Sequence, residues 1–335
     1  MKIAAVSVIL NECDIIELFI RINARVIDRF YIVDNGSSDH TLSILEALKH
    51  EGFPITLWRC RSVEYQQDLI TTFAMRQAWT EQPFDWVLPL DADEFIMADR
   101  ATLETKLRSL PRGVCGSLNW LTYVPQRSGY FELPNPLYVL FRPRAVECRQ
   151  MIKIAVPGSL VRAARLTLGN HLAMDASNRP FPSQSVSVRL GHVPVRSSQQ
   201  IISKAIIGSQ KLGLKRNRGP LQGFHWDIIA QTIQQNRYKL DDVQLRSMAL
   251  NYSQLPADPT CDVDDDGPAL GLEQDIVVYR ELSEVNLPER LGAFIEELSA
   301  AIKRQDASSA DDVRVCDWGM PDQSLHLREQ FSRIL

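Results

Sequence analysis

Short apolar runs and amphipathic helical patterns alternate through the first ninety residues of this 335-residue chain. The apolar runs are rich in β-branched residues, which is typical of buried parallel strands. Between them, apolar residues recur every three or four positions, which indicates helices with one buried face. This order requires a parallel sheet with helices on both faces. The predicted strands span residues 2–10, 30–33, 55–58 and 85–90, and the predicted helices 15–26, 42–48 and 66–79.

Polar clusters stand at the ends of three of these strands. Ligands of parallel α/β sheets bind beyond the carboxyl ends of the strands. We therefore expect the clusters to meet at one edge of the sheet and to form a binding site there. They are Asn11-Glu12, Asp34-Asn35-Gly36 and Asp91-Ala92-Asp93.

The strand–helix order breaks after residue 100. We predict a mostly parallel α/β sheet flanked by helices, followed by a mixed extension and a helical C-terminal region. The main domain is placed at residues 1–215, with halves 1–98 and 99–215, and a mainly helical extension at 216–335. The further predicted elements are strands at 114–124, 138–141 and 186–193, helices at 198–212 and 287–304, and a solvated acidic linker at 256–268.

Three carboxylates crowd together at the end of the fourth strand, in the stretch DWVLPLDADEF. Side chains two positions apart in an extended backbone point the same way, so Asp91 and Asp93 can offer oxygen atoms to one cation. A hard divalent ion such as Mg²⁺ or Mn²⁺ is commonly held by one or two carboxylates together with substrate phosphates. A DxD pattern also occurs in solvated loops and helix caps, but here it ends a buried strand.

Four segments, in this order, resemble the family-2-like glycosyltransferases, which have a GT-A fold and a DxD motif. The resemblance covers residues 1–215. It implies a metal-dependent, inverting, hexosyltransferase-type enzyme of polysaccharide biosynthesis. Its donor would be a nucleotide sugar (a UDP- or GDP-sugar), and its acceptor a glycan, a lipid-linked or another hydroxyl compound. The segments are VILNECDIIELFI at 8–20, FYIVDNGSSDHT at 30–41, WVLPLDADEFI at 86–96 and HVPVRSSQQIISKAIIG at 192–208.

The same resemblance places the nucleotide at the first two strand ends. The first cluster would line the base and ribose, and Asp34 would accept a hydrogen bond from the base. From the residues alone, Asp34 also suits a capping role, and Arg76 suits a surface salt bridge. The residues that the resemblance assigns to the nucleotide are Asn11, Glu12, Asp34, Asn35, Gly36, Ser37, Arg76 and Asp91.

The metal needs ligands besides Asp91 and Asp93, and a neutral imidazole suits Mn²⁺. His192 and His171 are the two candidates. We favour His192, because basic residues follow it closely in the sequence. A lone histidine is more often structural than a ligand, so both assignments are hypotheses.

Arg196 and Lys204 are the candidate diphosphate ligands. Arg196 could hold the diphosphate through two hydrogen bonds, and Lys204 could add a point charge. A helix predicted to begin near Ser198 would favour the same anion. An ordinary solvated lysine is the alternative for Lys204.

An inverting transfer also needs a group that accepts the proton of the acceptor hydroxyl. The acidic pair usual in the family has no clear match here. Glu94 and Asp227 are the candidates, although helix capping or an internal ion pair explains Glu94 equally well. Aromatic residues fall where an acceptor cleft is expected, but core packing is their commoner use. They are Trp120, Tyr123, Tyr130 and Phe131.

Composition limits the partners and the location. Lys and Arg number 37 and Asp and Glu 41, a net charge of −4, and no basic tract is interleaved with aromatics, which argues against nucleic acid. No apolar run reaches the roughly 18 residues of a membrane-spanning helix. Six cysteines without a CxxC pair fit a reducing compartment. We expect a cytoplasmic protein, at most peripheral at a membrane. Its C-terminal helix could cover the cleft, pair two subunits or touch a membrane, and its mixed charge favours protein contact over anionic lipid.

Two other functions fit part of the pattern. A phosphohydrolase that uses DxD as nucleophile and acid would carry the motif after the first strand, with a hydroxyl residue close behind. Here the motif follows the fourth strand, and Phe95 and Ile96 come next. A non-catalytic nucleotide-sugar or glycan-binding protein needs no base, so the missing base keeps this alternative open.

Overall fold

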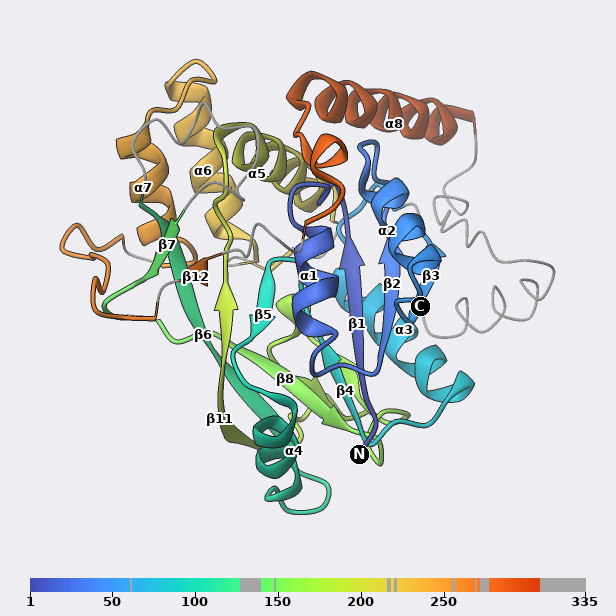
Figure 1. Ribbon diagram of the computed structural model, residues 1–335. Coiled ribbons are helices and arrows are strands. Elements are labelled where there is room, and N and C mark those ends of the chain that lie inside the picture. The colour runs from blue at the N-terminus through green and yellow to red at the C-terminus, as the bar shows by residue number, and fades with distance from the viewer. Residues whose placement is uncertain are drawn as a thin grey trace.

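A ten-stranded mixed sheet forms the centre of the computed structural model, with helices packed on its faces (Figure 1). The α/β class expected from the sequence, with a parallel N-terminal sheet and a mixed extension, is confirmed. The structure describes residues 1–60, 62–126, 140–147, 149–215, 218–219, 222–254, 257–268, 270–271 and 277–307. Tyr130 and Phe131 lie outside these residues.

Four parallel strands form the N-terminal half of the sheet. They are β1 (Ile3–Ile9), β2 (Arg29–Asp34), β3 (Ile55–Arg59) and β4 (Trp86–Pro89), and the helices between them are α1 (Ile16–Asn23), α2 (Thr41–His50) and α3 (Gln67–Glu81). The strand order is β3-β2-β1-β4. Side chains alternate between two cores. Ile3 and Ala5 pack in one core with α1 and α2, and Ala4 and Val6 in the other with α3.

The second half of the sheet is mainly antiparallel. Its elements are β5 (Glu94–Ile96), α4 (Arg100–Arg108), β6 (Cys115–Pro125), β7 (Leu140–Pro143), β8 (Ile152–Pro157), β11 (Ser183–His192) and β12 (Leu270–Gly271). From β4 onward the order is β8-β6-β7-β12, and each of these pairs is antiparallel. Strand β11 lies between β5 and β6, with His192 opposite Glu94 and Thr122. This register brings His192 to the end of the DxD strand.

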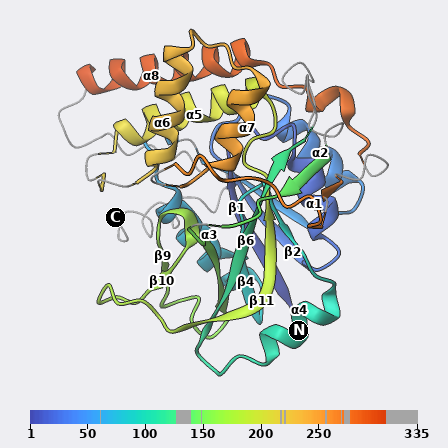
Figure 2. The ribbon, with the colours of Figure 1, turned by 90° about the vertical axis from the view of Figure 1, so that its left-hand side faces the viewer.

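A small hairpin and three helices complete the middle of the chain. The hairpin is β9 (Arg165–Leu166) and β10 (Ala173–Met174), joined by the 3-10 turn η3 (Leu168–Asn170), and the helices are α5 (Ser198–Gly213), α6 (Phe224–Gln235) and α7 (Asp242–Leu250). Helix α5 begins where the Ser197 side chain accepts a hydrogen bond from the Gln200 amide. The three helices lie beyond the carboxyl ends of the parallel strands (Figures 1 and 2).

The C-terminal segment, for which we expected a mainly helical extension with a solvated acidic linker, contacts the rest of the fold. The acidic stretch follows the edge of the sheet, where the Ala145 amide donates to the Asp262 carbonyl at 2.8 Å. The turn η5 (Arg280–Ser283) and helix α8 (Leu287–Ala307) come next. Before η5, the amides of Val278 and Tyr279 donate to the Glu17 carboxylate at 2.9 and 3.0 Å. The segment from residue 277 onward therefore packs on the N-terminal half of the fold.

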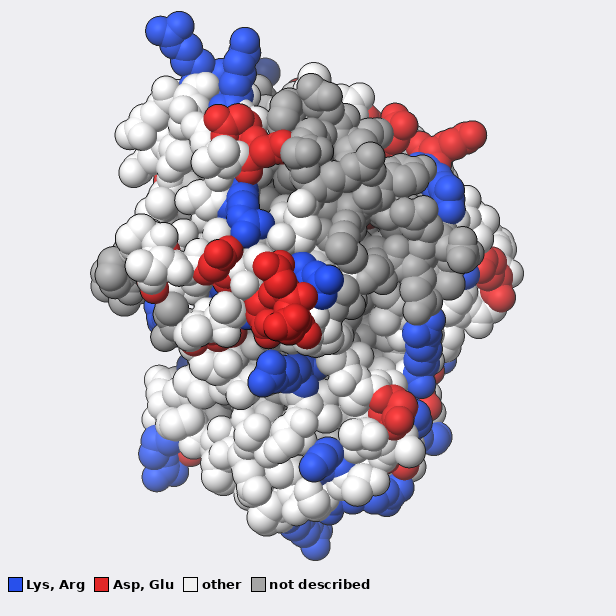
Figure 3. Space-filling model, turned by 60° about the vertical axis from the view of Figure 1, so that its left-hand side comes forward, with Lys and Arg blue, Asp and Glu red and all other residues white. Residues whose placement is uncertain are grey.

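Acidic and basic side chains are intermixed on the face shown in Figure 3, and the residues coloured there form no broad basic patch. None of the helices within the described ranges combines the length and the apolar character that a membrane crossing requires.

Candidate functional site

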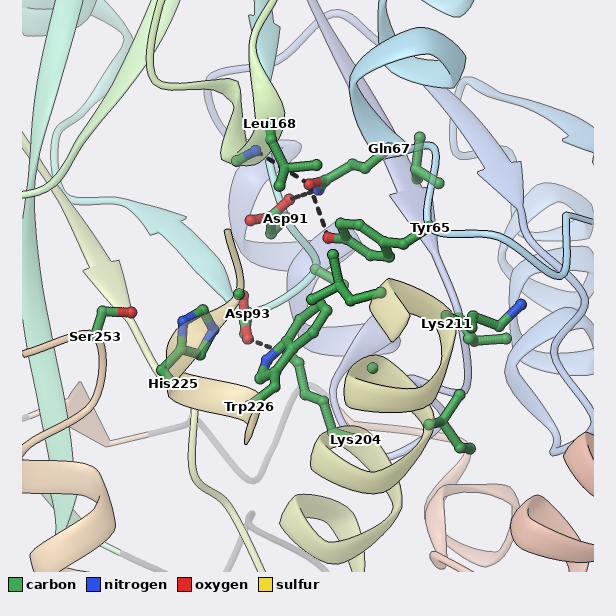
Figure 4. A pocket seen from close by; sticks show the side chains of 18 of the residues that line it. Tyr65, Gln67, Asp91, Asp93, Leu168, Lys204, Lys211, His225, Trp226 and Ser253 are labelled. Carbon is green, nitrogen blue, oxygen red and sulfur yellow. Dashed lines mark hydrogen bonds and ion pairs between the residues drawn. The ribbon is translucent and has the colours of Figure 1, made fainter. Parts of the chain in front are cut away.

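A cavity of about 400 Å³ opens at the carboxyl ends of β1 and β4, beside α5 and α6 (Figure 4). All three polar strand ends contribute to its wall, through Asn11, Asn35 and Asp93. The cavity therefore brings together clusters that are up to 82 positions apart in the sequence (93 − 11). Other side chains in its wall are Tyr65, Gln67, Trp120, His171, His192, Lys204, His225, Trp226 and Tyr252.

The turns after β1 and β2 are built from their own polar side chains. The Asp34 carboxylate is 2% exposed and accepts hydrogen bonds from the amides of Gly36 and Ser37. Gly36 has φ of 91°, a conformation that favours glycine. The Ser37 hydroxyl accepts from the Asn11 amide at 2.9 Å. Asp34 thus fixes the turn and lies behind the wall of the cavity, whereas Asn35 faces into it. Burial raises the pKa of Asp34.

Both carboxylate oxygens of Asp91 have partners within the protein. Gln67 Nε2 donates to Oδ1 at 2.9 Å, and the Lys153 ammonium donates to Oδ2 at 2.5 Å. The Lys153 side chain is 1% exposed, whereas that of Asp91 is 29% exposed. Burial lowers the pKa of Lys153, but Asp91 and Glu94 raise it by a larger amount. The net shift is upward, so the lysine stays charged. A buried cation therefore neutralises the first carboxylate of the DxD motif from behind.

Glu94 is fully buried beneath the cavity. Its Oε1 accepts from the Trp120 indole at 2.6 Å and its Oε2 from the Asp91 amide at 2.9 Å. Burial raises the pKa of Glu94 to about 8. Glu94 does not line the cavity, so it cannot reach the hydroxyl of an acceptor there. Its place is structural: it shapes the DxD turn and orients Trp120.

Asp93 is buried between a cation and an imidazole. Its Oδ2 accepts from Lys204 at 2.7 Å, and its Oδ1 lies 3.9 Å from His192 Nε2. Burial raises the pKa of Asp93, but the nearby positive charges, of which Lys204 has the largest effect, lower it by more. The pKa of Asp93 therefore lies well below its usual range. Burial also lowers the pKa of His192 to about 3, so the imidazole is neutral. Figure 4 shows Asp93 directed toward Lys204 and Asp91 toward Gln67.

The pair of Asp93 and His192 fits a divalent cation. The gap of 3.9 Å is too long for a hydrogen bond, yet both atoms can reach one ion placed between them. The other ring nitrogen, His192 Nδ1, is buried without a hydrogen-bond partner. Within the described ranges, no three His, Cys, Asp or Glu side chains gather closely enough to hold a metal by themselves. To hold such an ion, the pair would need further ligands from a substrate or water.

The rival histidine, His171, also lines the cavity, but its Nδ1 is 2.6 Å from the Ile152 carbonyl. Its ring meets the edge of Trp120, whereas the ring of His192 stacks on the same indole at 3.9 Å. Of the two histidines, His192 is the one that lies 3.9 Å from the Asp93 carboxylate.

The two expected diphosphate ligands differ in position. Lys204 lines the cavity and also lies 3.5 Å from Glu12 Oε1. Arg196 has a fully buried side chain, which donates to Asp14 at 2.7 Å and to Glu12 at 2.5 Å. The guanidinium of Arg196 holds the loop after β1 and does not line the cavity, which corrects the expected contact with a diphosphate. Its burial follows from Asp14, a buried carboxylate that needs a cation.

Two further expected site residues also lie away from the cavity. Arg76 donates to the Ala164 carbonyl at 2.9 Å. Asp227 pairs with Arg218 and accepts from Ser209, and it lines a second, smaller cavity of about 220 Å³. Neither side chain therefore faces the DxD carboxylates.

Several residues that line the cavity or lie behind its wall were not predicted. Lys153 left a signal in the sequence, since it is the single charged residue of an apolar strand. Trp226 packs against Gly208 so closely that a Cβ at that glycine would lie 2.4 Å from the indole. The aromatic residues Tyr65 and Tyr252 gave no local signal, because their loops have no regular pattern. Lys211, His225 and Arg290 lie on helices, and the helical pattern does not show which distant site a polar side chain faces.

No protein-family model matches the chain, and no curated protein matches it in sequence. Among solved structures, S. aureus TarS (residues 1–349) is similar at 12% identity over 76% of this chain and 73% of its own, with a TM-score of 0.36. The mannosyltransferase PcManGT from Pyrobaculum calidifontis, solved with GDP-Man and Mn²⁺, shares 14% identity over 100% of this chain and 81% of its own, also at 0.36. At scores this low, the likeness carries neither a reaction nor a ligand over to this chain.

Proposed function

We propose that this chain is a glycosyltransferase that takes a sugar from a nucleoside-diphosphate sugar and passes it to a hydroxyl acceptor. The observation that carries the proposal is that the polar ends of β1, β2 and β4 share one cavity with Lys204 and His192. Its volume of about 400 Å³ is typical of small-ligand sites. The sequence resemblance to DxD glycosyltransferases with a GT-A fold supports the same reading.

Within this proposal, Asn11 and Asn35 offer amide groups to the base and ribose of the donor. The ammonium of Lys204 supplies positive charge beside the diphosphate. Gln67 and Lys153 hold the Asp91 carboxylate in place, and because it remains partly exposed it can also accept a hydrogen bond from the nucleotide sugar. A UDP- or GDP-sugar fits this set of groups.

A divalent cation, Mn²⁺ or Mg²⁺, belongs to the proposal. Asp93 Oδ1 and His192 Nε2 would hold it, and phosphate oxygens of the donor would complete its coordination. When bound, it would neutralise the charge that develops on the leaving diphosphate. The chain's own contribution is to keep His192 neutral by burial and Asp93 ionised by its basic neighbours.

The acceptor side of the cavity is aromatic. The rings of His225 and Tyr252 lie 4.9 Å apart, and Trp226 meets Tyr65 edge-on at 5.0 Å. Aromatic faces suit the apolar face of a sugar ring. We propose a glycan or another sugar-containing compound as acceptor. Its hydroxyl oxygen would bond to the donor sugar on the side opposite the diphosphate, with inversion, as the bond to the diphosphate breaks; the nucleoside diphosphate leaves and the hydroxyl proton is released to water.

A thermal-shift screen tests this function. The panel is UDP, GDP and their common sugar conjugates, each with Mn²⁺ and with EDTA, because a ligand that binds only the folded state raises the melting temperature. We expect one nucleotide series to stabilise the protein more with Mn²⁺ than with EDTA. Release of free nucleoside diphosphate from the best conjugate, faster with a sugar acceptor present, would establish transfer. Stabilisation by no nucleotide in the panel would overturn the proposal.

A non-catalytic nucleotide-sugar-binding protein is the second candidate. It is favoured by one observation: neither Glu94 nor Asp227, the two carboxylates considered as bases, faces the cavity. The two functions separate in the same experiment. Donor binding without release of nucleoside diphosphate, across many acceptors, would support the binding protein.

A further inference from the structure

Arg290, at the start of α8, joins three elements that surround the cavity. Although it is only 1% exposed, it also lines the cavity. Its Nη2 donates to Asp39 Oδ2 at 2.7 Å and to Cys13 Sγ at 3.3 Å, and its Nη1 donates to Ser203 Oγ at 3.2 Å. One guanidinium therefore contacts the loop after β1, the loop after β2 and helix α5.

The two loops also bind each other. Asn11 Oδ1 accepts from the Ser38 amide at 2.8 Å, and the Cys13 amide donates to Asp39 Oδ2 at 3.4 Å. Asn11 has φ of 57°, a left-handed conformation that persists only where its surroundings hold it. Asp39 Oδ2 is thus shared by Arg290 and by the loop that contains Asn11. Loss of the guanidinium would remove the cation that anchors this shared carboxylate.

Hydrogen bonds of the residues that precede α8 hold the start of this helix, and with it Arg290, in place. In addition to the two amides that bind Glu17, the Tyr279 hydroxyl donates to Glu51 Oε1 at 2.5 Å. The Cys13 thiol donates to the Glu284 carbonyl at 3.5 Å. These contacts reach α1, the residue that follows α2 and the loop after β1. The segment that precedes Arg290, from residue 277 onward, is therefore attached to the N-terminal half of the fold.

We propose that Arg290 is a positioning residue for the nucleotide, which sets the loops after β1 and β2 in the arrangement that the donor's base and ribose require. This inference rests on the proposed function. Its physical basis is the planar guanidinium, whose five N–H donors are spread over three nitrogen atoms in a fixed fork, whereas an ammonium donates from a single atom. A loop that is ordered before binding does not have to be ordered by the ligand, so the ligand binds more tightly.

The test compares Arg290→Gln, Arg290→Lys and a matched control, Arg100→Gln. Arg100 donates to the carbonyls of Val26 and Met1, both at 2.6 Å, at the opposite end of the sheet. Affinity for UDP and GDP is measured by calorimetry well below the melting temperature of every variant. Hydrogen exchange of residues 11–13 and 36–39 is measured on the same proteins without nucleotide.

We expect Arg290→Gln to weaken nucleoside diphosphate binding about tenfold and to speed exchange in both loops. Arg290→Lys keeps the charge but loses the forked donors, so its affinity and loop exchange rates should lie between those of Arg290→Gln and the wild type. If Arg290→Gln fails to fold, Arg290→Lys takes its place in the comparison. Arg100→Gln should lower the melting temperature without changing affinity. Wild-type affinity and loop exchange in both Arg290 variants would overturn the role of Arg290. If the wild type itself binds no nucleoside diphosphate, the proposed function and this role both fail.

Discussion

The carboxylate of Asp93 and the imidazole of His192 face each other with 3.9 Å between Oδ1 and Nε2, too far for a hydrogen bond. The backbone sets this separation, because the Val193 amide donates to the Asp93 carbonyl at 2.9 Å. The end of β11 is thereby attached to the DxD turn. Both side chains are nearly fully buried, so neither can turn toward solvent to find another partner.

The Asp93 and His192 pair predicts how the protein responds to Mn²⁺. In Asp93→Ala and in His192→Ala, the added rise in melting temperature that Mn²⁺ gives in the presence of a nucleoside diphosphate should disappear, because each variant removes one of the two proposed protein ligands. Asp227→Ala is the control, since Asp227 lies in a separate cavity. A full Mn²⁺ effect in His192→Ala would show that the ion binds elsewhere.

Lys153→Met should destabilise the protein by about 3 kcal/mol, because it leaves the Asp91 carboxylate without its buried cation. Urea unfolding measures the loss. The double variant Lys153→Met with Asp91→Asn should recover part of it, because the unpaired carboxylate is removed. A loss below about 1 kcal/mol in Lys153→Met would contradict the ion-pair assignment.

Gly208 and Gly213 lie on the same helix and should respond to alanine in opposite directions. A Cβ at Gly208 would lie 2.4 Å from a ring carbon of Trp226, whereas a Cβ at Gly213 meets nothing within 4 Å. Gly208→Ala should cost about 1–3 kcal/mol through overpacking and displace Trp226 from the cavity wall. Gly213→Ala should be neutral or stabilising by up to about 1 kcal/mol. Equal stability of the two variants, with unchanged tryptophan fluorescence, would refute the close packing.

Stability should fall on acidification through the histidines of the cavity. Burial lowers the pKa of His171 to about 4 and that of His225 to about 3. In the unfolded chain histidine titrates near pH 6.5, so between about pH 6.5 and 4 the unfolded state binds protons that the folded state does not. The free energy of unfolding then drops by at most about 1.4 kcal/mol per pH unit for each histidine, and partial exposure reduces this.

The variant His225→Gln checks this pH dependence. Its free energy of unfolding, measured with EDTA present, should fall less steeply than that of the wild type between pH 6.5 and 5. An identical slope in the two proteins would mean that His225 titrates normally in the folded state.

The sequence predicted the parallel half of the sheet well, because buried parallel strands and their helices have strong periodic patterns. The same periodicity located the cavity, since Asn11, Asn35 and Asp93 follow strands whose carboxyl ends meet. Burial was harder to predict. Arg196 lies close to His192 in sequence, yet its guanidinium turns toward Asp14, and no local pattern distinguishes a buried ion pair from an exposed cation.

The C-terminal contacts of the site could not be read from the sequence. Arg290 and Asp39 are 251 positions apart, and the segment around Arg290 looks like an ordinary mixed-charge amphipathic helix. Lys153 is the exception among the missed residues, because a single lysine within an apolar strand is costly to bury and implies a nearby carboxylate. The periodic pattern shows which face of an element is buried, but not which distant charge meets it.

The central claim is that a nucleoside-diphosphate sugar binds in this cavity through the DxD carboxylates. Its most direct test is calorimetric titration of the wild type and of Asp93→Asn with the best nucleoside diphosphate from the screen, with Mn²⁺ present. We predict one binding site in the wild type and affinity at least about tenfold weaker in a folded Asp93→Asn. Equal affinity in the two proteins, or no binding by the wild type, would contradict the account.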